Sequence, residues 1–200
     1  SDFFEDNRNL VIGAGVGLIV LAIAAVLFFN WRQAKAAEGQ EYLGAILTEY
    51  EIGNYQAALD GTDAAPGLLD LADDYSSTPT GDQARFFAAD AYLQLGQTQE
   101  ALEMFEAYDG EGILGASALA GQAAIHESMD EHAEAAALYE RAAGAYAEDA
   151  TAPGYLLDAA RAYGEAGDTD AAMASIQTLL DTYGDAPEVI MAEMEMGRLE

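Results

Sequence analysis

The chain has 200 residues, of which 36 are Asp or Glu and 7 are Lys or Arg, so its formal net charge is -29. This charge argues against nucleic acid as a partner, because a polyanion would be repelled. The composition is 52% hydrophobic with eleven Tyr and seven Phe, which excludes the disordered, weakly hydrophobic class of chains. There is no cysteine, so a disulfide framework, a thiolate zinc site and a cysteine nucleophile are all excluded.

The excess of acid has two possible origins. One is adaptation to high salt, as in a halophile, where carboxylates keep the surface hydrated while salt screens their mutual repulsion. The other is an ordinary acidic domain. The excess lies entirely downstream, because the first 35 residues carry three acids and three bases.

Near the N-terminus, residues 10–29 read LVIGAGVGLIVLAIAAVLFF, without a charge. About 20 such residues are enough to cross a hydrocarbon core. Trp31, Arg32 and Lys35 follow, as interfacial anchors usually do. We therefore expect a flank over residues 1–9, a single transmembrane helix over 10–30 and a juxtamembrane linker helix over 31–40. The alternative is a cleaved signal peptide, which would need a shorter apolar run and a cleavage site of small residues. The sequence Phe28-Phe29-Asn30-Trp31 at the end of the run supplies neither.

Two glycines inside this stretch, Gly13 and Gly17, are spaced so that they share one helix face. Such a GxxxG pattern allows another membrane helix to pack closely, although membrane helices also tolerate glycine without a partner. The flanks carry one base before the span and two after it, which mildly favours a cytoplasmic C-terminal side.

Beyond residue 36 the chain is rich in alanine, with apolar residues at spacings of three and four, which predicts helices. Proline marks helix boundaries in this part, and Pro153 is expected to open a helix. Thr80, with Gln83 three residues on, predicts a capping box at a helix start.

An internal repeat organises the region. Ala101 and Ala135 are 34 residues apart, which is the tetratricopeptide period, and Ala135 and Ala172 are 37 apart. Each of these three alanines lies five positions after an expected turn residue and four positions before an aromatic or aliphatic residue. The three copies are AYLQLGQTQEALEMFEAY, AIHESMDEHAEAAALYERA and AYGEAGDTDAAMASIQTL; a degenerate copy, EIGNYQAALDG, precedes them across an insertion.

These features predict an all-α protein with one N-terminal transmembrane helix and a tetratricopeptide-like α-solenoid of about four helical hairpins over residues 41–200. The repeat register predicts a concave groove that binds a segment of a partner protein. The side chains of this groove would suit an apolar or basic partner segment. The alternative for each groove residue is that it only packs or faces water. The groove residues are Phe86, Asp90, Leu93, Glu127, Leu157 and Arg161.

No pattern indicates catalysis. His126 and His132 lie among acidic residues, but a six-residue separation does not place two rings on one helix face, so we expect no metal site. The carboxylates have no recognisable catalytic setting, and no nucleophile elbow is present. We expect no enzyme, no cofactor and no small-molecule substrate.

Three segments carry a family resemblance: FFEDNRNLVIGAGVGL at the span, ALDGTDAAPGLLDLADDY in the insertion and ILGASALAGQAA before the third hairpin. On these, the chain resembles the YfgM-like tetratricopeptide-repeat membrane proteins, in the form common in the Bacteroidota. These are ancillary subunits of the SecYEG translocon.

The resemblance implies a single-pass protein of the bacterial inner membrane with the repeat domain in the periplasm. Its implied partners are SecYEG and a membrane-anchored periplasmic chaperone of the prolyl-isomerase type, so that the chain would assist protein export. This orientation differs from the one that the flanking charges favour. The alternative function is a structural accessory subunit of another membrane complex.

High-salt adaptation makes a prediction for the domain comprising residues 36–200. Its free energy of unfolding should fall as ionic strength is lowered, because the carboxylates then repel one another without screening. Denaturant unfolding at several salt concentrations measures this. Full stability at low ionic strength would contradict the adaptation to salt.

Overall fold

The computed structural model describes residues 8–147 and 150–199, with side chains from residue 16 onward. The described chain is helical and forms no strand; Gly61 and Pro66 make an isolated bridge. The helices in chain order are α2 (Arg8–Glu51), α3 (Tyr55–Asp60), α4 (Leu68–Asp74), α5 (Pro79–Gln94), α6 (Thr98–Glu106), α7 (Gly112–Ser128), α8 (His132–Ala145), α9 (Ala152–Glu165), α10 (Thr169–Thr182) and α11 (Val189–Leu199).

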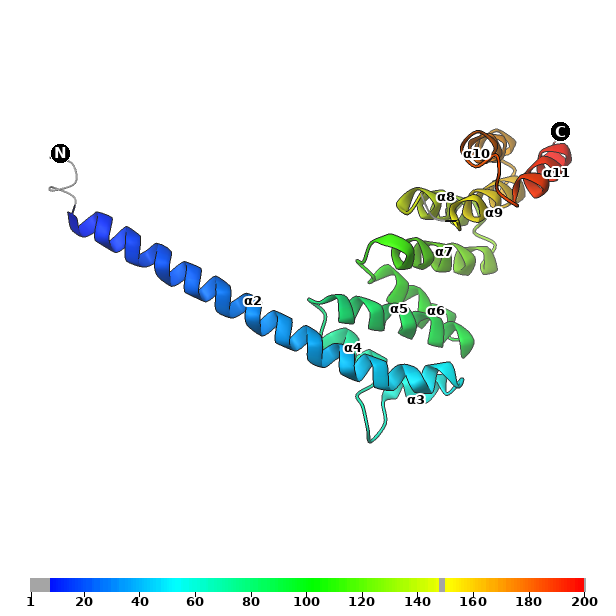
Figure 1. The fold of residues 1–200 in the computed structure, drawn as a ribbon. Helices are drawn as coiled ribbons and strands as arrows, with labels where there is room; N and C mark the ends of the chain where they lie inside the picture. The colour runs from blue at the N-terminus through cyan, green and yellow to red at the C-terminus, as the bar shows by residue number, and fades with distance from the viewer. Residues whose placement is uncertain (1–7, 148–149, 200) are drawn as a thin grey trace.

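Helix α2 has 44 residues, and its N-terminal part is an arm that projects from the rest of the molecule (Figure 1). The side chains of residues 16–34 are exposed, and the helix becomes part of the core only further along, where Leu43 and Ile46 are buried. The apolar part is long enough to cross a membrane. One unbroken helix therefore runs through the predicted segments 10–30 and 31–40, whose boundaries remain predictions.

The four helical hairpins have the same type of turn between their two helices. The central residue of this turn is Gly53, Gly96, Asp130 or Gly167, and each has a positive φ, between 61° and 83°. Asp130 is the one non-glycine residue with positive φ in the described chain. The next backbone N–H bonds a carbonyl five residues back, which caps the first helix. These bonds are Asn54 to Glu49 (2.9 Å), Gln97 to Tyr92 (2.8 Å), Glu131 to His126 (2.9 Å) and Asp168 to Tyr163 (2.9 Å).

Five residues after each turn residue lies an alanine with no exposed surface: Ala58, Ala101, Ala135 and Ala172. The lack of a larger side chain lets the two helices of a hairpin approach closely. Apolar residues on either side complete separate clusters along the array, such as Leu157, Ile176 and Leu179 near its end. The predicted all-α architecture with about four hairpins is confirmed (Figure 1).

The insertion between the first two hairpins forms a loop and helix α4, which packs on α5 through the fully buried Leu68 and Leu71. The predicted capping box at Thr80 is wrong. The N-cap of α5 is Thr78, whose side chain accepts a hydrogen bond from the Gly81 N–H, and Pro79 follows it at the first helical turn. Thr80 lies inside the helix, where its hydroxyl accepts a hydrogen bond from Gln40 (3.0 Å).

The turn conformation makes a stability prediction. Gly96→Ala should cost about 1 kcal/mol, because φ is 75° there and a Cβ disfavours that conformation although no atom lies near it. Gly44→Ala is the matched control: its Cβ also meets no atom, but it lies inside α2 and should stabilise by up to about 1 kcal/mol. Urea unfolding compares the two. Equal effects would contradict the role of the turn.

Candidate partner-binding surfaces

Three of the six predicted groove residues lie on α5. Phe86 belongs to an aromatic group, with ring centroids 5.9 Å from Phe105 and 6.1 Å from Tyr108. The Asp90 carboxylate accepts a hydrogen bond from the Tyr50 hydroxyl of α2. Leu93 packs beside the same aromatic group. All three are half-buried, so part of each side chain remains open to a partner.

Glu127 and Arg161 belong to one charged group at the junction of α7, α8 and α9. The Tyr139 hydroxyl donates to Glu127 (2.9 Å), and Arg161 pairs with Asp158 (3.3 Å). Burial raises the pKa of Asp158; Arg161 acts against this shift, and the Glu127 charge adds to it. The structure therefore brings two predicted groove residues together around Asp158.

Leu157 does not face an open surface. It is only 3% exposed and lies in the cluster that Ile176, Leu179 and Ala192 complete. Helix α11, which contributes Ala192, packs over this end of the array and supplies part of that cover. The prediction of Leu157 as a groove residue is wrong, and partner contact by the other five remains a prediction.

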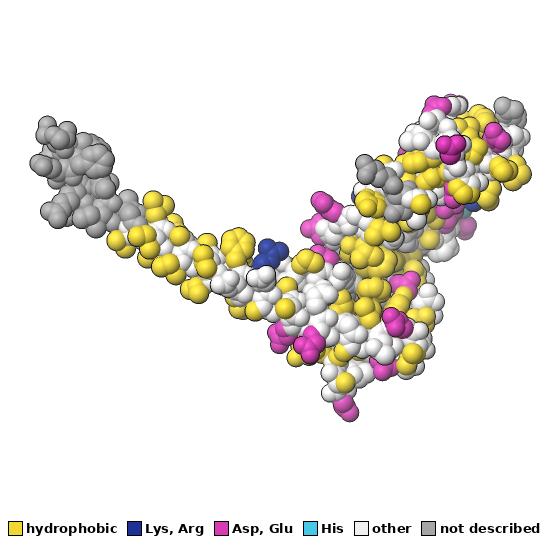
Figure 2. All heavy atoms as spheres, in the orientation of Figure 1, with side chains coloured by type: hydrophobic (Ala, Val, Ile, Leu, Met, Phe, Trp, Pro, Cys, Tyr) yellow, Lys and Arg dark blue, Asp and Glu magenta, His cyan; other side chains and the backbone are white. Residues whose placement is uncertain are grey.

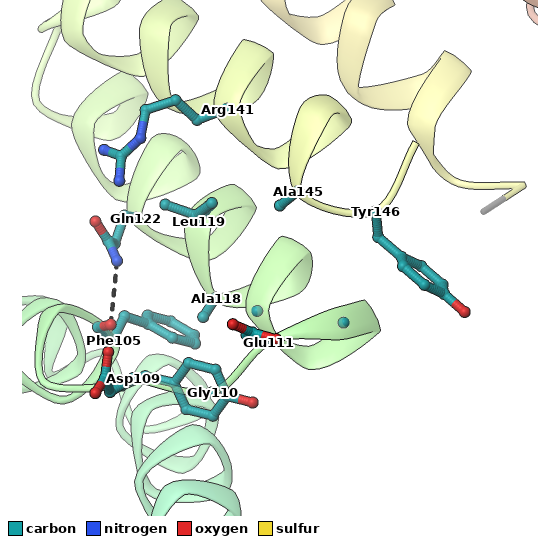
Figure 3. Close-up of a pocket in the computed structure, with 13 residues that line it drawn as sticks. Phe105, Asp109, Gly110, Glu111, Ala118, Leu119, Gln122, Arg141, Ala145 and Tyr146 are labelled. Carbon is teal, nitrogen blue, oxygen red and sulfur yellow. Dashed lines mark hydrogen bonds between the residues drawn. The ribbon is translucent and has the colours of Figure 1, made fainter. Parts of the chain in front are cut away.

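A hollow lies away from the predicted groove residues, over α7 between α6 and the end of α8 (Figure 3). This cavity, which we name the α7 pocket, has a volume of about 650 Å³. Its walls include Phe105, Leu119, Ala145 and Tyr146, and none of the six predicted groove residues lines it. Sequence analysis missed this site.

Small residues of α7 lie along the α7 pocket. Gly115 and Ala118 belong to its lining and are buried, and a Cβ on Gly115 would lie 2.6 Å from the Gly110 carbonyl oxygen, so glycine there lets the loop before α7 approach the helix. At Gly121 the Phe105 ring lies so close that a Cβ would be 2.7 Å from it, so a larger residue there would displace the ring. The segment ILGASALAGQAA holds these residues, and its richness in Gly, Ala and Ser is the signal in the sequence.

The two ends of the α7 pocket carry opposite charge. Figure 3 shows the Arg141 guanidinium on the α8 side, beside Gln122, and the Asp109 and Glu111 carboxylates on the opposite side. Within the described chain Arg141 makes no ion pair, although carboxylates outnumber bases about fivefold in the sequence. An unpaired guanidinium beside an open apolar hollow is available to an acidic group of a partner.

The other bases of the repeat domain are engaged. Arg85 pairs with Asp82 (2.8 Å), and Arg198 pairs with Glu195 (2.5 Å). His126 contacts Glu131 through Nδ1 (2.7 Å), whereas His132 faces Asp130 (3.9 Å), so the two rings are directed at different carboxylates. Acidic side chains are spread over the face of the domain in Figure 2, whereas the arm is apolar.

The predicted packing glycines lie in the exposed part of α2. Gly17 has no atom of the structure near the position of a Cβ, so its side of the helix is open. Gly13 lies in the helical backbone of α2, outside the residues whose surroundings the structure describes. Helix packing by this pair remains a prediction.

Comparisons place the fold among tetratricopeptide-like (TPR-like) repeats. No family model matches the chain, and no curated protein matches its sequence. The chain is similar to a crystal structure of nearly identical TPR-like repeats from a Podosopora anserina protein described as a kinesin light chain. The identity is 16% and the TM-score 0.58, over 82% of this chain and 86% of that one. A variant of that protein gives the same TM-score of 0.58 and is covered to 85%. At this identity the likeness shows the fold alone.

The hydrogen bond between Tyr139 and Glu127 should contribute measurably to stability. Tyr139→Phe should cost about 1 to 2 kcal/mol, because the half-buried Glu127 carboxylate then loses a hydrogen-bond donor. Tyr146→Phe is the matched control, since Tyr146 is exposed and no hydrogen bond of its hydroxyl is seen in the described chain. Thermal unfolding at neutral pH distinguishes them; an equal effect of both changes would contradict the prediction.

The same contact predicts a pH dependence. Burial and the hydrogen bond to Glu127 raise the pKa of Tyr139 above its ordinary value of 10.0. The folded chain then holds this proton more tightly than the unfolded chain, so its contribution is complete below pH 10 and is lost as pH rises above 10. Tyr139→Phe should therefore lessen the fall in unfolding free energy between pH 9 and pH 11. An unchanged slope would show that Tyr139 does not titrate this way.

Proposed function

We propose that this chain is a membrane-anchored protein-interaction module and an ancillary subunit of the Sec translocon that assists protein export. The observation that carries the anchored module is helix α2. Its apolar half is exposed along residues 16–34, and its other half supplies Leu43 and Ile46 to the core of the repeat domain. A soluble protein would have little reason to expose such a surface.

The repeat domain supports protein binding. TPR-like arrays present extended surfaces built from helix faces and typically serve as interaction scaffolds rather than enzymes. Here the α7 pocket offers an apolar floor with Arg141 at one end and Asp109 and Glu111 at the other. We infer that a short partner segment inserts an apolar side chain there, with an acidic group near Arg141 and a basic group near the two carboxylates.

The family resemblance supports the finer role. It favours SecYEG and a membrane-anchored periplasmic chaperone of the prolyl-isomerase type as partners. It also favours the bacterial inner membrane, with the repeat domain in the periplasm. The two bases that follow the apolar stretch do not prevent this orientation, because long domains cross membranes largely regardless of charge.

A second candidate is a structural accessory subunit of another membrane complex. The open side of α2 at Gly17 favours it, because a partner helix could pack there. Under this alternative the span, and not the α7 pocket, would hold the partner.

Co-purification tests the proposal. The tagged full chain is extracted from its native membrane with mild detergent at native salt, and its partners are identified by mass spectrometry. Ala145→Trp should fill the α7 pocket and reduce partner recovery several-fold. Ala137→Trp is the matched control, because Ala137 is also exposed on α8 and does not line the pocket.

Recovery of SecY, SecE or the isomerase with the parent chain and the control, but not with Ala145→Trp, supports the role and the site. Equal recovery with both variants would exclude the pocket. Absence of these proteins beside another intact complex would overturn the translocon role.

A further inference from the structure

The corner between α4 and α5, residues 75–80, is attached to α2 just beyond the apolar stretch. The Arg32 guanidinium donates to the Ser77 carbonyl oxygen (3.0 Å). One turn further along, the Lys35 ammonium lies 5.2 Å from the centre of the Tyr75 ring and 5.6 Å from that of Trp31. The residues expected at the membrane interface thus hold a distant part of the chain.

Further contacts fix this corner on α2. Tyr75 is only 6% exposed, and its ring lies 2.7 Å from the position of a Cβ on Gly39, so only glycine leaves room for it. Gln40 donates to the Thr80 hydroxyl (3.0 Å) and to Gln83 (2.9 Å). The corner therefore follows α2 rigidly and cannot be placed independently of the arm.

The depth of the corner follows from the rise of the helix. A spanning helix that ends near Phe29 places Arg32 about 4.5 Å and Lys35 about 9 Å beyond the hydrocarbon core. The headgroup layer on each side is roughly 5 to 8 Å thick. Ser77 and Tyr75, which contact these two bases, then lie at the headgroup surface.

The chemistry of the corner suits that position. Ser76, Ser77 and Pro79 are exposed, and no acidic residue occurs from 75 to 81, although the exposed Asp73 and Asp74 come directly before the corner and Glu38 makes a hydrogen bond with Tyr75. The nearest acid after it, Asp82, is paired with Arg85 (2.8 Å). Figure 2 shows basic side chains where the apolar arm meets the domain. The exposed hydroxyl groups of the corner, together with the two bases that contact it, can bond lipid phosphates.

We propose that the α4–α5 corner rests on the phospholipid headgroups and acts as a second contact of the repeat domain with the bilayer. This inference rests on the proposed membrane anchor. The contact holds the array at one angle to the membrane and leaves the α7 pocket, on later helices, free for partners.

The test uses the full chain, which contains no cysteine, so a single introduced cysteine can carry a nitroxide spin label. Ser77→Cys and Ser76→Cys report on the corner, Leu21→Cys on the apolar stretch and Ala137→Cys on the exposed face of α8. Each protein is reconstituted in phosphatidylcholine vesicles containing a small fraction of nickel-chelating lipid. Spin relaxation by the nickel headgroups is then measured, and oxygen accessibility reports lipid depth.

Nickel relaxation several-fold stronger at Ser77 and Ser76 than at Ala137, with Leu21 accessible to oxygen in lipid, supports the contact. A label at Leu21 in lipid, with corner labels no more relaxed than Ala137, would overturn the headgroup contact while leaving the anchor intact. A label at Leu21 in water would overturn the anchor itself.

Discussion

The structure depends on one helix that serves two environments. Helix α2 satisfies its own backbone hydrogen bonds along its length, so it can pass from a place where every side chain is exposed to one where Leu43 and Ile46 are fully packed. Because no break separates the two halves, the position of the arm determines the position of the first hairpin. The contacts of Arg32 and Lys35 with the α4–α5 corner strengthen this coupling.

The remaining hairpins extend the array by repeating the same turn and the same helix packing. A left-handed turn residue reverses the chain, and a buried alanine five residues later lets the second helix lie close to the first. Small residues have the same role on α7, where Gly115 lets the Gly110 carbonyl approach the helix and Gly121 makes room for the Phe105 ring. The α7 pocket lies beside these close contacts.

The regular features were accessible from the sequence and the irregular ones were not. The spacing of Gly96 and Ala101 is local, so it predicts its hairpin directly, and the same spacing before Ala135 places Asp130 in the position of the glycine. Repeat register places Leu157 in the groove because it does not reveal that α11 covers this residue. The contact of Gly39 with Tyr75 joins residues 36 positions apart and could not be read from either segment alone.

The central claim is that the arm anchors a folded interaction domain in a bilayer, and liposome flotation tests it most directly. The full chain, synthesised with phosphatidylcholine vesicles, should float with the lipid in a sucrose gradient and remain there after a urea wash. Replacing Leu21 and Ala24 with arginine should leave the helical domain folded, as judged by circular dichroism, but keep it at the bottom of the gradient. Flotation of both proteins alike, or of neither, would contradict the account.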